Sequence, residues 1–281
     1  MQDFDNKVAV VTGAGGALGR EIAAACAQRG MRLVLSDVNA EALAESERLL
    51  RQRWPAVAIL AMRVDVSRLE QVEALARAAI ERFGAAHLLF NNAGVGVAAP
   101  IWENTAEDWA WVSNVNLFGV AWGVKAFVPL MLKQQEGHVV NIASAAGWVH
   151  PAGSGVYNVT KAAVVALSES LANDLVLAGS SVGVSVVSPA YFPSGIADSE
   201  RNRPGELAAT ADSAMRRQYE EQLKKAMESG KISAAQIAGS ILEAVEHKRF
   251  YVFPHPFVTD GIAAKSKAAK LGQTAFNPRT S

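Results

Sequence analysis

Residues 7–19 read KVAVVTGAGGALG, and this stretch decides the fold. Its first part, 7–12, is a short apolar run without alternating polar residues, which is typical of a strand buried on both faces in a parallel sheet. Three glycines follow, and a helical pattern covers 18–29. Glycine permits a tight turn and a close approach of backbone to ligand, and the start of a helix offers free N–H groups to a phosphate. The stretch therefore predicts a strand, a phosphate-binding turn and a helix.

The same alternation of buried strands and helices continues along the chain. Further strands are predicted at 32–36, 58–64, 87–91, 138–144, 182–188 and 250–253. Helical patterns lie between them, at 40–53, 69–82, 106–132, 156–177 and 234–247. This alternation predicts a doubly wound α/β fold, a Rossmann-like parallel sheet with helices on both faces. Because no linker-like segment divides the 281 residues, we expect a single domain over 1–281.

Two segments do not follow this alternation. Residues 190–232 form a long insertion after the sixth strand, with an amphipathic helical pattern at about 212–229. Long insertions at strand ends often cover a ligand site, so we interpret this one as a lid. Residues 255–281 show no clear periodicity, and we expect an irregular, solvated tail.

Composition argues against several classes of protein. The 27 basic and 27 acidic side chains balance, which gives no electrostatic reason to expect nucleic acid or an anionic membrane as a partner. With no apolar run of about 18 residues and no signal-peptide pattern, we expect neither a membrane span nor secretion. A single cysteine, Cys26, fits a cytoplasmic location. The five histidines lack metal-ligand spacing, so we expect no metal site.

The glycine pattern leaves two interpretations open. The common pattern G-x-G-x-x-G does not fit, because Leu18 stands at its last glycine. The patterns T-G-x-x-G-x-x-G and T-G-x-x-x-(G/A)-x-G both fit, the second with Ala17 in its variable position. In either case we expect a dinucleotide to contact Gly13, Gly16, Ala17, Leu18 and Gly19.

Acidic residues follow the second and third strands. Asp37 can accept hydrogen bonds from the adenosine ribose and repel a 2′-phosphate. Neither Val38 nor Asn39 is a cation that would hold such a phosphate, so we expect NAD in preference to NADP. We expect Asp65 and Val66 at the adenine ring. For both aspartates, capping of the next helix is the alternative role.

Small residues end the fourth strand in the sequence NNAG. They would let the nicotinamide ribose lie against the backbone, so we expect cofactor contacts from Asn92, Ala93 and Gly94. Asn- and Gly-rich strand ends are also common turns, which is the alternative.

A second group of residues points to proton transfer. Tyr157 and Lys161 are one turn apart on a helix face. An ammonium group near a phenol lowers the phenol pKa, which would let Tyr157 exchange a proton with an alcohol or ketone. Ser144 ends the preceding strand, where its hydroxyl would hold the substrate oxygen. Asn116 lies mid-helix, and its buried amide would find partners in a water chain to Lys161; an ordinary polar core role is the alternative.

In order and spacing, these residues resemble the short-chain dehydrogenase/reductase family, in its shorter-chain branch. The resemblance covers about residues 5–195 and implies an oxidoreductase with a tetrad of Asn116, Ser144, Tyr157 and Lys161. In that tetrad Tyr is the acid and base, Ser orients the substrate, Lys lowers the Tyr pKa and binds ribose, and Asn organises a relay water. The family also implies cofactor contacts from Pro189, Phe192 and Ser194.

Two departures from the family pattern affect these expectations. Ala190 follows Pro189 where the family usually has glycine, which restricts the loop that carries Phe192 and Ser194. The glycine-rich last strand region, which often builds the tetramer interface, is replaced by FYVFPHP at 250–256. We therefore expect a homodimer or an altered homotetramer.

The positions expected to face the substrate are mainly apolar or aromatic: Val95, Ala146, Trp148, His150 and Tyr191. Because none of them is a cation for a carboxylate or phosphate, they indicate a bulky uncharged alcohol or ketone, of aromatic or steroid-like shape. Packing of the loops is the alternative role for these side chains. Two other functions stay open: a dinucleotide-binding regulator without catalysis, and a dehydratase or epimerase on the same fold.

Overall fold

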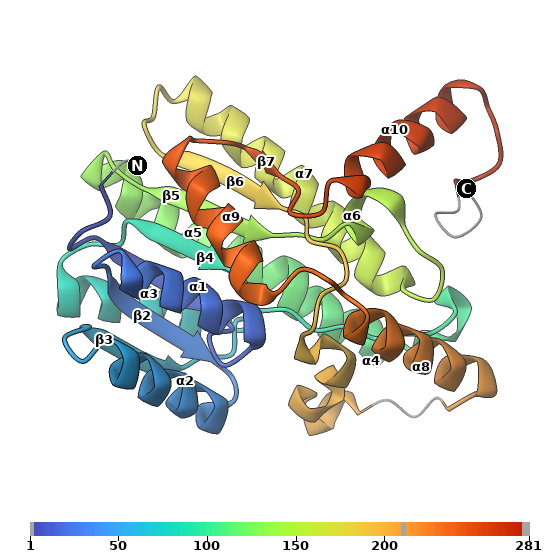
Figure 1. The fold of residues 1–281 in the computed structure, drawn as a ribbon, viewed down its shortest axis with the longest axis horizontal. Coiled ribbons are helices and arrows are strands. Elements are labelled where there is room, and N and C mark those ends of the chain that lie inside the picture. The colour runs from blue at the N-terminus through green and yellow to red at the C-terminus, as the bar shows by residue number, and fades with distance from the viewer. Residues whose placement is uncertain (1–2, 209–211, 277–281) are drawn as a thin grey trace.

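The computed structural model describes residues 3–208 and 212–276, and it is built on a seven-stranded parallel sheet (Figure 1). The strand order is β3-β2-β1-β4-β5-β6-β7, so the direction of winding reverses between β1 and β4. This confirms the doubly wound fold, in which ligands bind at the carboxyl ends of the strands near the reversal. The strands are β1 (Val8–Thr12), β2 (Arg32–Asp37), β3 (Ile59–Arg63), β4 (Leu88–Asn91), β5 (His138–Ile142), β6 (Gly183–Val187) and β7 (Tyr251–Val252).

Helices cover both faces of the sheet. One face packs against α1 (Ala17–Gln28), α2 (Ala40–Arg53) and α9 (Ala234–Glu246). The other packs against α3 (Leu69–Phe83), α5 (Gly119–Gln134) and α7 (Gly155–Leu177). Alternate residues of β1 serve the two cores: Val11 lies in the first and Val10 in the second. Both faces of the strand are therefore buried, which explains its unbroken apolar run.

A nearly continuous helical run connects β4 to β5. It consists of α4 (Ala106–Ser113), a π-helical turn (Asn114–Phe118) and α5. By length and composition alone this run, Ala106–Gln134, is the one described helix apolar enough to cross a membrane. Its inner face, however, contributes Phe127 and Met131 to the core beside the sheet. This burial accounts for its apolar character as a core helix.

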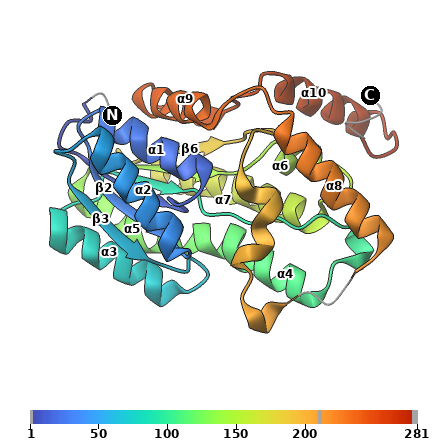
Figure 2. The same cartoon turned by 60° about the horizontal axis from the view of Figure 1, so that its bottom comes forward.

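The insertion after β6 folds over the carboxyl ends of the strands. It contains the 3-10 helices η3 (Gly195–Asn202) and η4 (Gly205–Leu207), followed by α8 (Ala214–Glu228). These segments gather with α4 at one end of the molecule (Figure 2). Two shorter helices, η1 (Ile101–Glu103) and α6 (Ala146–Val149), follow β4 and β5.

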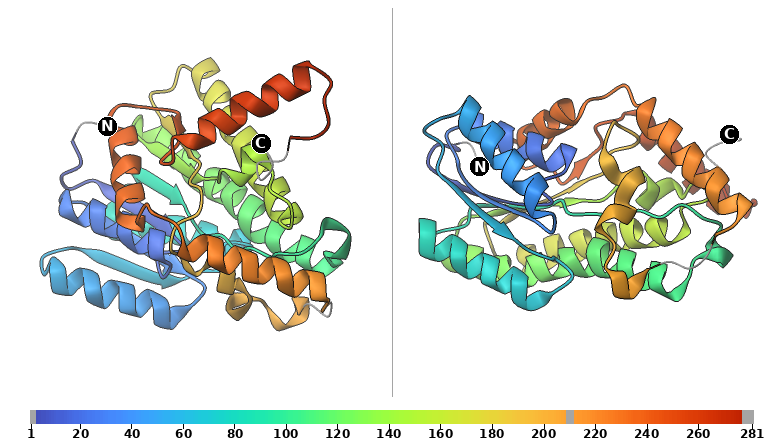
Figure 3. Two further views of the ribbon diagram at one scale, coloured as in Figure 1. Left: turned by 45° about the vertical axis from the view of Figure 1, so that its right-hand side comes forward. Right: turned by 90° about the horizontal axis from the view of Figure 1, so that it is seen from below.

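The prediction of an irregular tail is wrong for most of that segment. Residues Phe257–Lys270 form the helix α10, which lies against α6 (Figure 3). Its sequence is rich in alanine and lysine, which are good helix formers. Val258, Ile262 and Lys265 share the packed face, and Lys265 Nζ donates to Trp148 O at 2.7 Å. The apolar stripe is so short that periodicity alone does not reveal it.

Burial of His138 predicts a loss of stability in acid. Its Nε2 lies 2.8 Å from Ser185 Oγ, and burial lowers the pKa of the imidazole to about 3. An unfolded histidine binds its proton near pH 6.5, so between pH 6.5 and 3 unfolding takes up a proton. We expect the free energy of unfolding to fall with pH in this window, by up to about 1.4 kcal/mol per pH unit from His138 alone.

Urea unfolding of the wild type and of His138→Gln at pH 7, 6, 5 and 4 measures this contribution. The variant should lose stability less steeply, since other titrating groups act equally in both proteins. Replacement of the exposed His247 by Gln is the matched control and should follow the wild type. Parallel stability curves for wild type and His138→Gln would exclude the proposed titration.

Candidate active site

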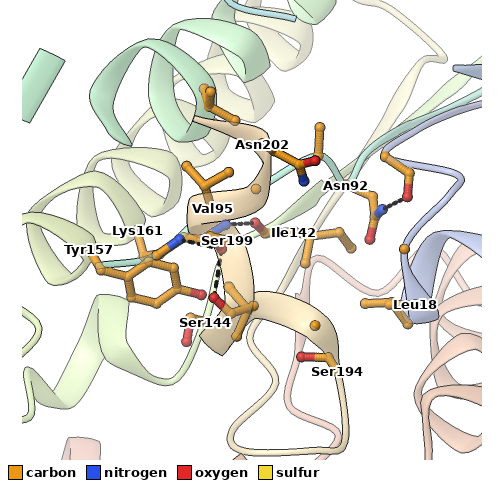
Figure 4. A pocket seen from close by; sticks show the side chains of 18 of the residues that line it. Leu18, Asn92, Val95, Ile142, Ser144, Tyr157, Lys161, Ser194, Ser199 and Asn202 are labelled. Carbon is orange, nitrogen blue, oxygen red and sulfur yellow. Dashed lines mark hydrogen bonds between the residues drawn. The ribbon is translucent and has the colours of Figure 1, made fainter. Parts of the chain in front are cut away.

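A cavity of about 470 Å³ runs along the carboxyl ends of the strands. It brings together residues as far apart in sequence as Gly13 and Phe257, and its volume is typical of a small-molecule site. In Figure 4, Leu18 and Asn92 lie on one side, and Ser144, Tyr157 and Lys161 lie on the other. The predicted nucleotide turn and the predicted proton-transfer residues therefore line one cavity.

Three of the four glycines within residues 13–19 have different structural roles. Gly13 has a φ of +66°, which favours glycine in the tight turn. A Cβ on Gly19 would lie 2.1 Å from Gly13 O, so α1 packs too closely on the turn for any other residue. A Cβ on Gly16 would meet only Gly13 O, at 3.4 Å, and Gly16 lines the cavity at the start of α1. This open backbone at a helix N-terminus fits a pyrophosphate.

Asp37 is held rigidly beside this turn. Its Oδ2 accepts from Gly15 N–H and its Oδ1 from Asn39 N–H, both at 2.9 Å. The cap of α2 is Asn39, whose Oδ1 accepts from Ala42 N–H, so the capping alternative for Asp37 is excluded. A fixed carboxylate that lines the cavity can accept hydrogen bonds from ribose hydroxyls.

Asp65 and Val66 also line the cavity. Asp65 Oδ1 accepts from Ser67 N–H at 2.9 Å, in a turn just before α3. The N-cap position of α3 itself is Arg68, so Asp65 shapes the loop that leads into the helix. Both residues therefore lie at the cavity beyond the end of the third strand.

The ends of β1 and β4 are joined by side-chain hydrogen bonds. Thr12 Oγ1 accepts from Asn92 N–H and Ala93 N–H, at 3.0 and 3.1 Å. Asn92 Nδ2 donates in return to Thr12 O, at 2.8 Å. These bonds fix the strand ends where the winding reverses, and they leave Ala93 and Gly94 lining the cavity.

Tyr157 lies near the start of α7 and faces Ser144. The pKa of its phenol is raised to about 12, mainly by burial. Tyr191 raises this pKa further, and a hydrogen bond with the Ser144 hydroxyl opposes the rise. Ser144 accepts from Ala146 N–H at 3.1 Å and donates to Pro189 O at 3.4 Å. The serine is thus oriented by both neighbouring loops, and its hydroxyl and the phenol can meet one substrate oxygen.

Lys161 lies one helical turn after Tyr157 in α7, close to the tyrosine ring. Its Nζ is 5.6 Å from the centroid of the Tyr157 ring and donates to Ile142 O at 2.8 Å. Burial lowers the pKa of the ammonium to about 8. A Cβ on Gly94 would lie 3.6 Å from Nζ, so the missing side chain there leaves the ammonium reachable from the cavity.

Asn116 lies in the π-helical turn and is completely buried. Its Oδ1 accepts from Val95 N–H at 2.8 Å, and its Nδ2 donates to Val95 O at 2.9 Å and to Thr160 Oγ1 at 3.2 Å. The oxygen and the nitrogen of this side-chain amide therefore both have protein partners, and the expected water chain to Lys161 stays a prediction. Asn116 does not line the cavity, so it acts on the site by holding Val95 and α7 in place.

The loop after β6 is braced by a residue that the sequence reasoning did not include. Pro189, Phe192 and Ser194 line the cavity as expected. Ala190 N–H donates to His255 Nδ1 at 3.1 Å, and His255 is buried. Burial lowers the pKa of this imidazole, which keeps Nδ1 free to accept. The segment that replaces the family's glycine-rich region thus supports the substrate loop.

Three of the five expected substrate contacts line the cavity: Val95, Ala146 and Tyr191. Trp148 and His150 lie outside its lining. Trp148 Nε1 donates to Ser188 Oγ at 2.9 Å, and its ring contacts Tyr251. His150 accepts from Lys265 Nζ at 3.3 Å. The Trp148 side chain faces β7 and His150 faces α10, which their sequence positions could not reveal.

The insertion contributes most of the lining that sequence missed. Apolar side chains come from α4, the β4 loop and the insertion: Val97, Trp111, Ile196, Leu207, Leu223 and Met227. Arg201 is a cation in this lining, but its guanidinium donates to the carbonyls of Gly195 and Asp198. Within residues 3–208 and 212–276, no three His, Cys, Asp or Glu side chains gather as metal ligands.

Comparison with known proteins identifies the family. The family model for short chain dehydrogenases matches residues 7–205. A CLA biosynthesis dehydrogenase/reductase from Lactiplantibacillus plantarum is 31% identical over 261 residues, which are 91% of this chain and 90% of the relative. A C alpha-dehydrogenase from Sphingobium sp. is 34% identical over 267 residues, which are 93% of this chain and 85% of the relative.

A solved structure agrees over almost the whole length. It is a short chain dehydrogenase/reductase from Burkholderia phymatum in complex with NAD, 45% identical to this chain. The TM-score is 0.96, and 99% of each chain is covered. Sequence and fold thus agree on one assignment: the chain belongs to the short-chain dehydrogenase/reductase family.

Proposed function

We propose that this oxidoreductase uses NAD to interconvert a bulky, uncharged secondary alcohol and its ketone. The observation that carries the proposal is the arrangement of one cavity. Its nucleotide side holds the open glycine turn and the fixed Asp37, and its other side holds Tyr157, Ser144 and Lys161. The nucleotide side would bind the cofactor that exchanges a hydride, and the other side would exchange a proton with the substrate oxygen.

NAD, when bound, would supply the hydride acceptor or donor. The residues that fit it are the glycine turn, Asp37, Asp65, Val66 and the 92–94 segment. Pro189, Phe192 and Ser194 would close the cavity over it from the insertion side. The related Burkholderia phymatum structure is described as a complex with NAD, which supports the choice of cofactor.

The chain's own residues handle the proton. The Ser144 hydroxyl, held by Ala146 N–H and Pro189 O, orients the substrate oxygen. The Tyr157 hydroxyl is within the same hydrogen-bond set and gives or takes the proton. Lys161 donates to Ile142 O and, with its remaining N–H groups, would reach ribose hydroxyls in the cavity, while Asn116 fixes the backbone of Val95. The catalytic tetrad is thus three residues at the cavity and one behind it.

The substrate side of the cavity favours an apolar molecule. Its lining includes Val95, Val97, Trp111 and Met227, and its one arginine is bound to backbone carbonyls. The other cation among the described lining residues is Lys161, whose ammonium donates to Ile142 O, so a carboxylate or phosphate would find no unengaged cation there. A ketone with an aromatic or fused-ring body matches this chemistry.

We also propose a homo-oligomer, a dimer or a tetramer, and a cytoplasmic location. Exposed apolar side chains on the π turn, α5 and α7 support self-association: Phe118, Leu132, Val159, Val176 and Leu177. Sedimentation velocity distinguishes the two assemblies.

Replacement of Tyr157 by Phe tests the chemistry. General acid–base catalysis contributes about a hundredfold or more to rate, so we expect kcat to fall at least that far on the best ketone or alcohol of a panel. Affinity for NADH, followed by its fluorescence, should change little. The rate of change of NADH absorbance at saturating substrate measures kcat.

Tyr251→Phe is the matched control, because that hydroxyl binds Glu169 at the surface. It should retain wild-type turnover. A Tyr157→Phe enzyme as fast as the wild type would reject the proposed role. Tight NADH binding without turnover of any alcohol or ketone by the wild type would favour the regulator instead.

Replacement of Asp37 by Asn tests the choice of cofactor. Hydrogen bonds to a charged group contribute about 1.5–3 kcal/mol, so the variant should bind NADH about tenfold or more weakly. Loss of the negative charge should also reduce the discrimination against NADPH. Fluorescence titration of both dinucleotides measures this, and equal wild-type affinity for NADH and NADPH would refute the role of Asp37.

A further inference from the structure

The roof of the substrate cavity is built by the insertion. Leu207 in η4, together with Leu223 and Met227 in α8, lines the cavity from that side. None of these residues belongs to the sheet, so their position depends on how the insertion is attached (Figure 2). The attachment therefore determines the shape of the cavity.

The attachment centres on a buried carboxylate in α4. Asp108 is fully buried, and two arginines of the insertion reach it. Arg203 Nη2 lies 2.6 Å from Asp108 Oδ1, and Arg216 Nη1 lies 3.0 Å from Oδ2. The arginine side chains are only 4% and 5% exposed. One carboxylate thus binds the chain both after η3 and in the first turn of α8.

Asp108 and Arg203 make further contacts that connect the ion pairs to the cavity wall and to the start of α4. Arg203 lies over the Trp111 ring, 4.2 Å from its centroid, and Trp111 lines the cavity. Asp108 also accepts from Thr105 N–H in the capping box that begins α4. Burial would raise the pKa of Asp108, but hydrogen bonds from Arg216 and Arg203 outweigh it and hold the pKa below its ordinary value.

The opposite edge of the insertion is attached to the strand loop. Ser199 Oγ accepts from Gly96 N–H at 3.0 Å and donates to Ile196 O at 2.6 Å. Ser199 is buried in η3. Because Gly96 lies two residues after Gly94, this bond fixes the near edge of the roof, while Asp108 fixes its far edge.

We propose that Asp108 is a positioning residue that holds the roof of the cavity through Arg203 and Arg216, and thereby determines how large a substrate the enzyme binds. The inference rests on the proposed alcohol and ketone chemistry. Buried ion pairs are often no more stabilising than apolar replacements, but they require one geometry. Apolar contacts alone would allow the insertion several positions over the cavity, whereas the ion pairs of Asp108 with Arg203 and Arg216 favour one position.

The experiment compares the wild type with Asp108→Asn and Arg216→Met. Asn retains an acceptor for Thr105 N–H, and Met retains the aliphatic length of the arginine. Arg217→Met is the matched control, because Arg217 is exposed and pairs with Asp212 at the surface. Hydrogen exchange of amides in α8 and β5 is measured by mass spectrometry. KM and kcat are measured with the best ring ketone of the panel and with cyclohexanone.

Both variants should exchange the α8 amides about tenfold or more faster, with β5 unchanged. KM for the large ketone should rise about tenfold, while its kcat and the KM of cyclohexanone stay within about twofold. If Asp108→Asn does not fold, Arg216→Met decides, because it leaves Asp108, Arg203 and the helix cap in place.

Unchanged α8 exchange in the variants would overturn the proposal, and so would an equal rise in KM for both ketones, which indicates general damage. Failure of the proposed function is recognised separately, because the wild type would then turn over neither ketone. The exchange rates of α8 still test the attachment in that case.

Discussion

The site depends on the buried amide of Asn116. This one side chain binds both backbone groups of Val95 and the hydroxyl of Thr160, so it joins the loop after β4 to α7. Asn116 lies in a π-helical turn, a form that is frequent at functional sites. Without that connection, α7 would not hold Tyr157 at a fixed distance from the β4 loop. A buried amide with all its partners in place restricts the local geometry more than apolar contacts do.

The sequence predicts the fold and the nucleotide side well, because both depend on local patterns. Strands buried on both faces appear as unbroken apolar runs, as in β1, and the glycines mark places where a side chain would collide, as at Gly19. Parallel strands present their carboxyl ends at one edge, so residues that follow different strands must meet there. Asp37 and Ser144 could therefore be placed in one cavity from their positions after strands alone.

Contacts between distant segments limit what the sequence can predict. Trp148 and His150 follow Ser144 closely, but β7 and α10 draw both side chains away from the cavity. His255 and Asp108 act through partners 65 and 95 residues away, and no local periodicity marks either pairing. The helical tail has too short an apolar stripe to reveal its packing. The cavity roof is therefore the least predictable part, although it determines the substrate side of the site.

Burial also determines which charges the site can hold. It raises the pKa of Tyr157 to about 12 and lowers that of Lys161 to about 8, so at pH 7 the phenol is neutral while the lysine is still mostly an ammonium. Lys161 directs its ammonium to Ile142 O, and a hydrogen bond with Ser144 lowers the phenol pKa. Forming the phenolate costs about 1.4 kcal/mol for each pH unit below its pKa. The described residues therefore keep Tyr157 protonated at neutral pH, which is the form that can donate a proton.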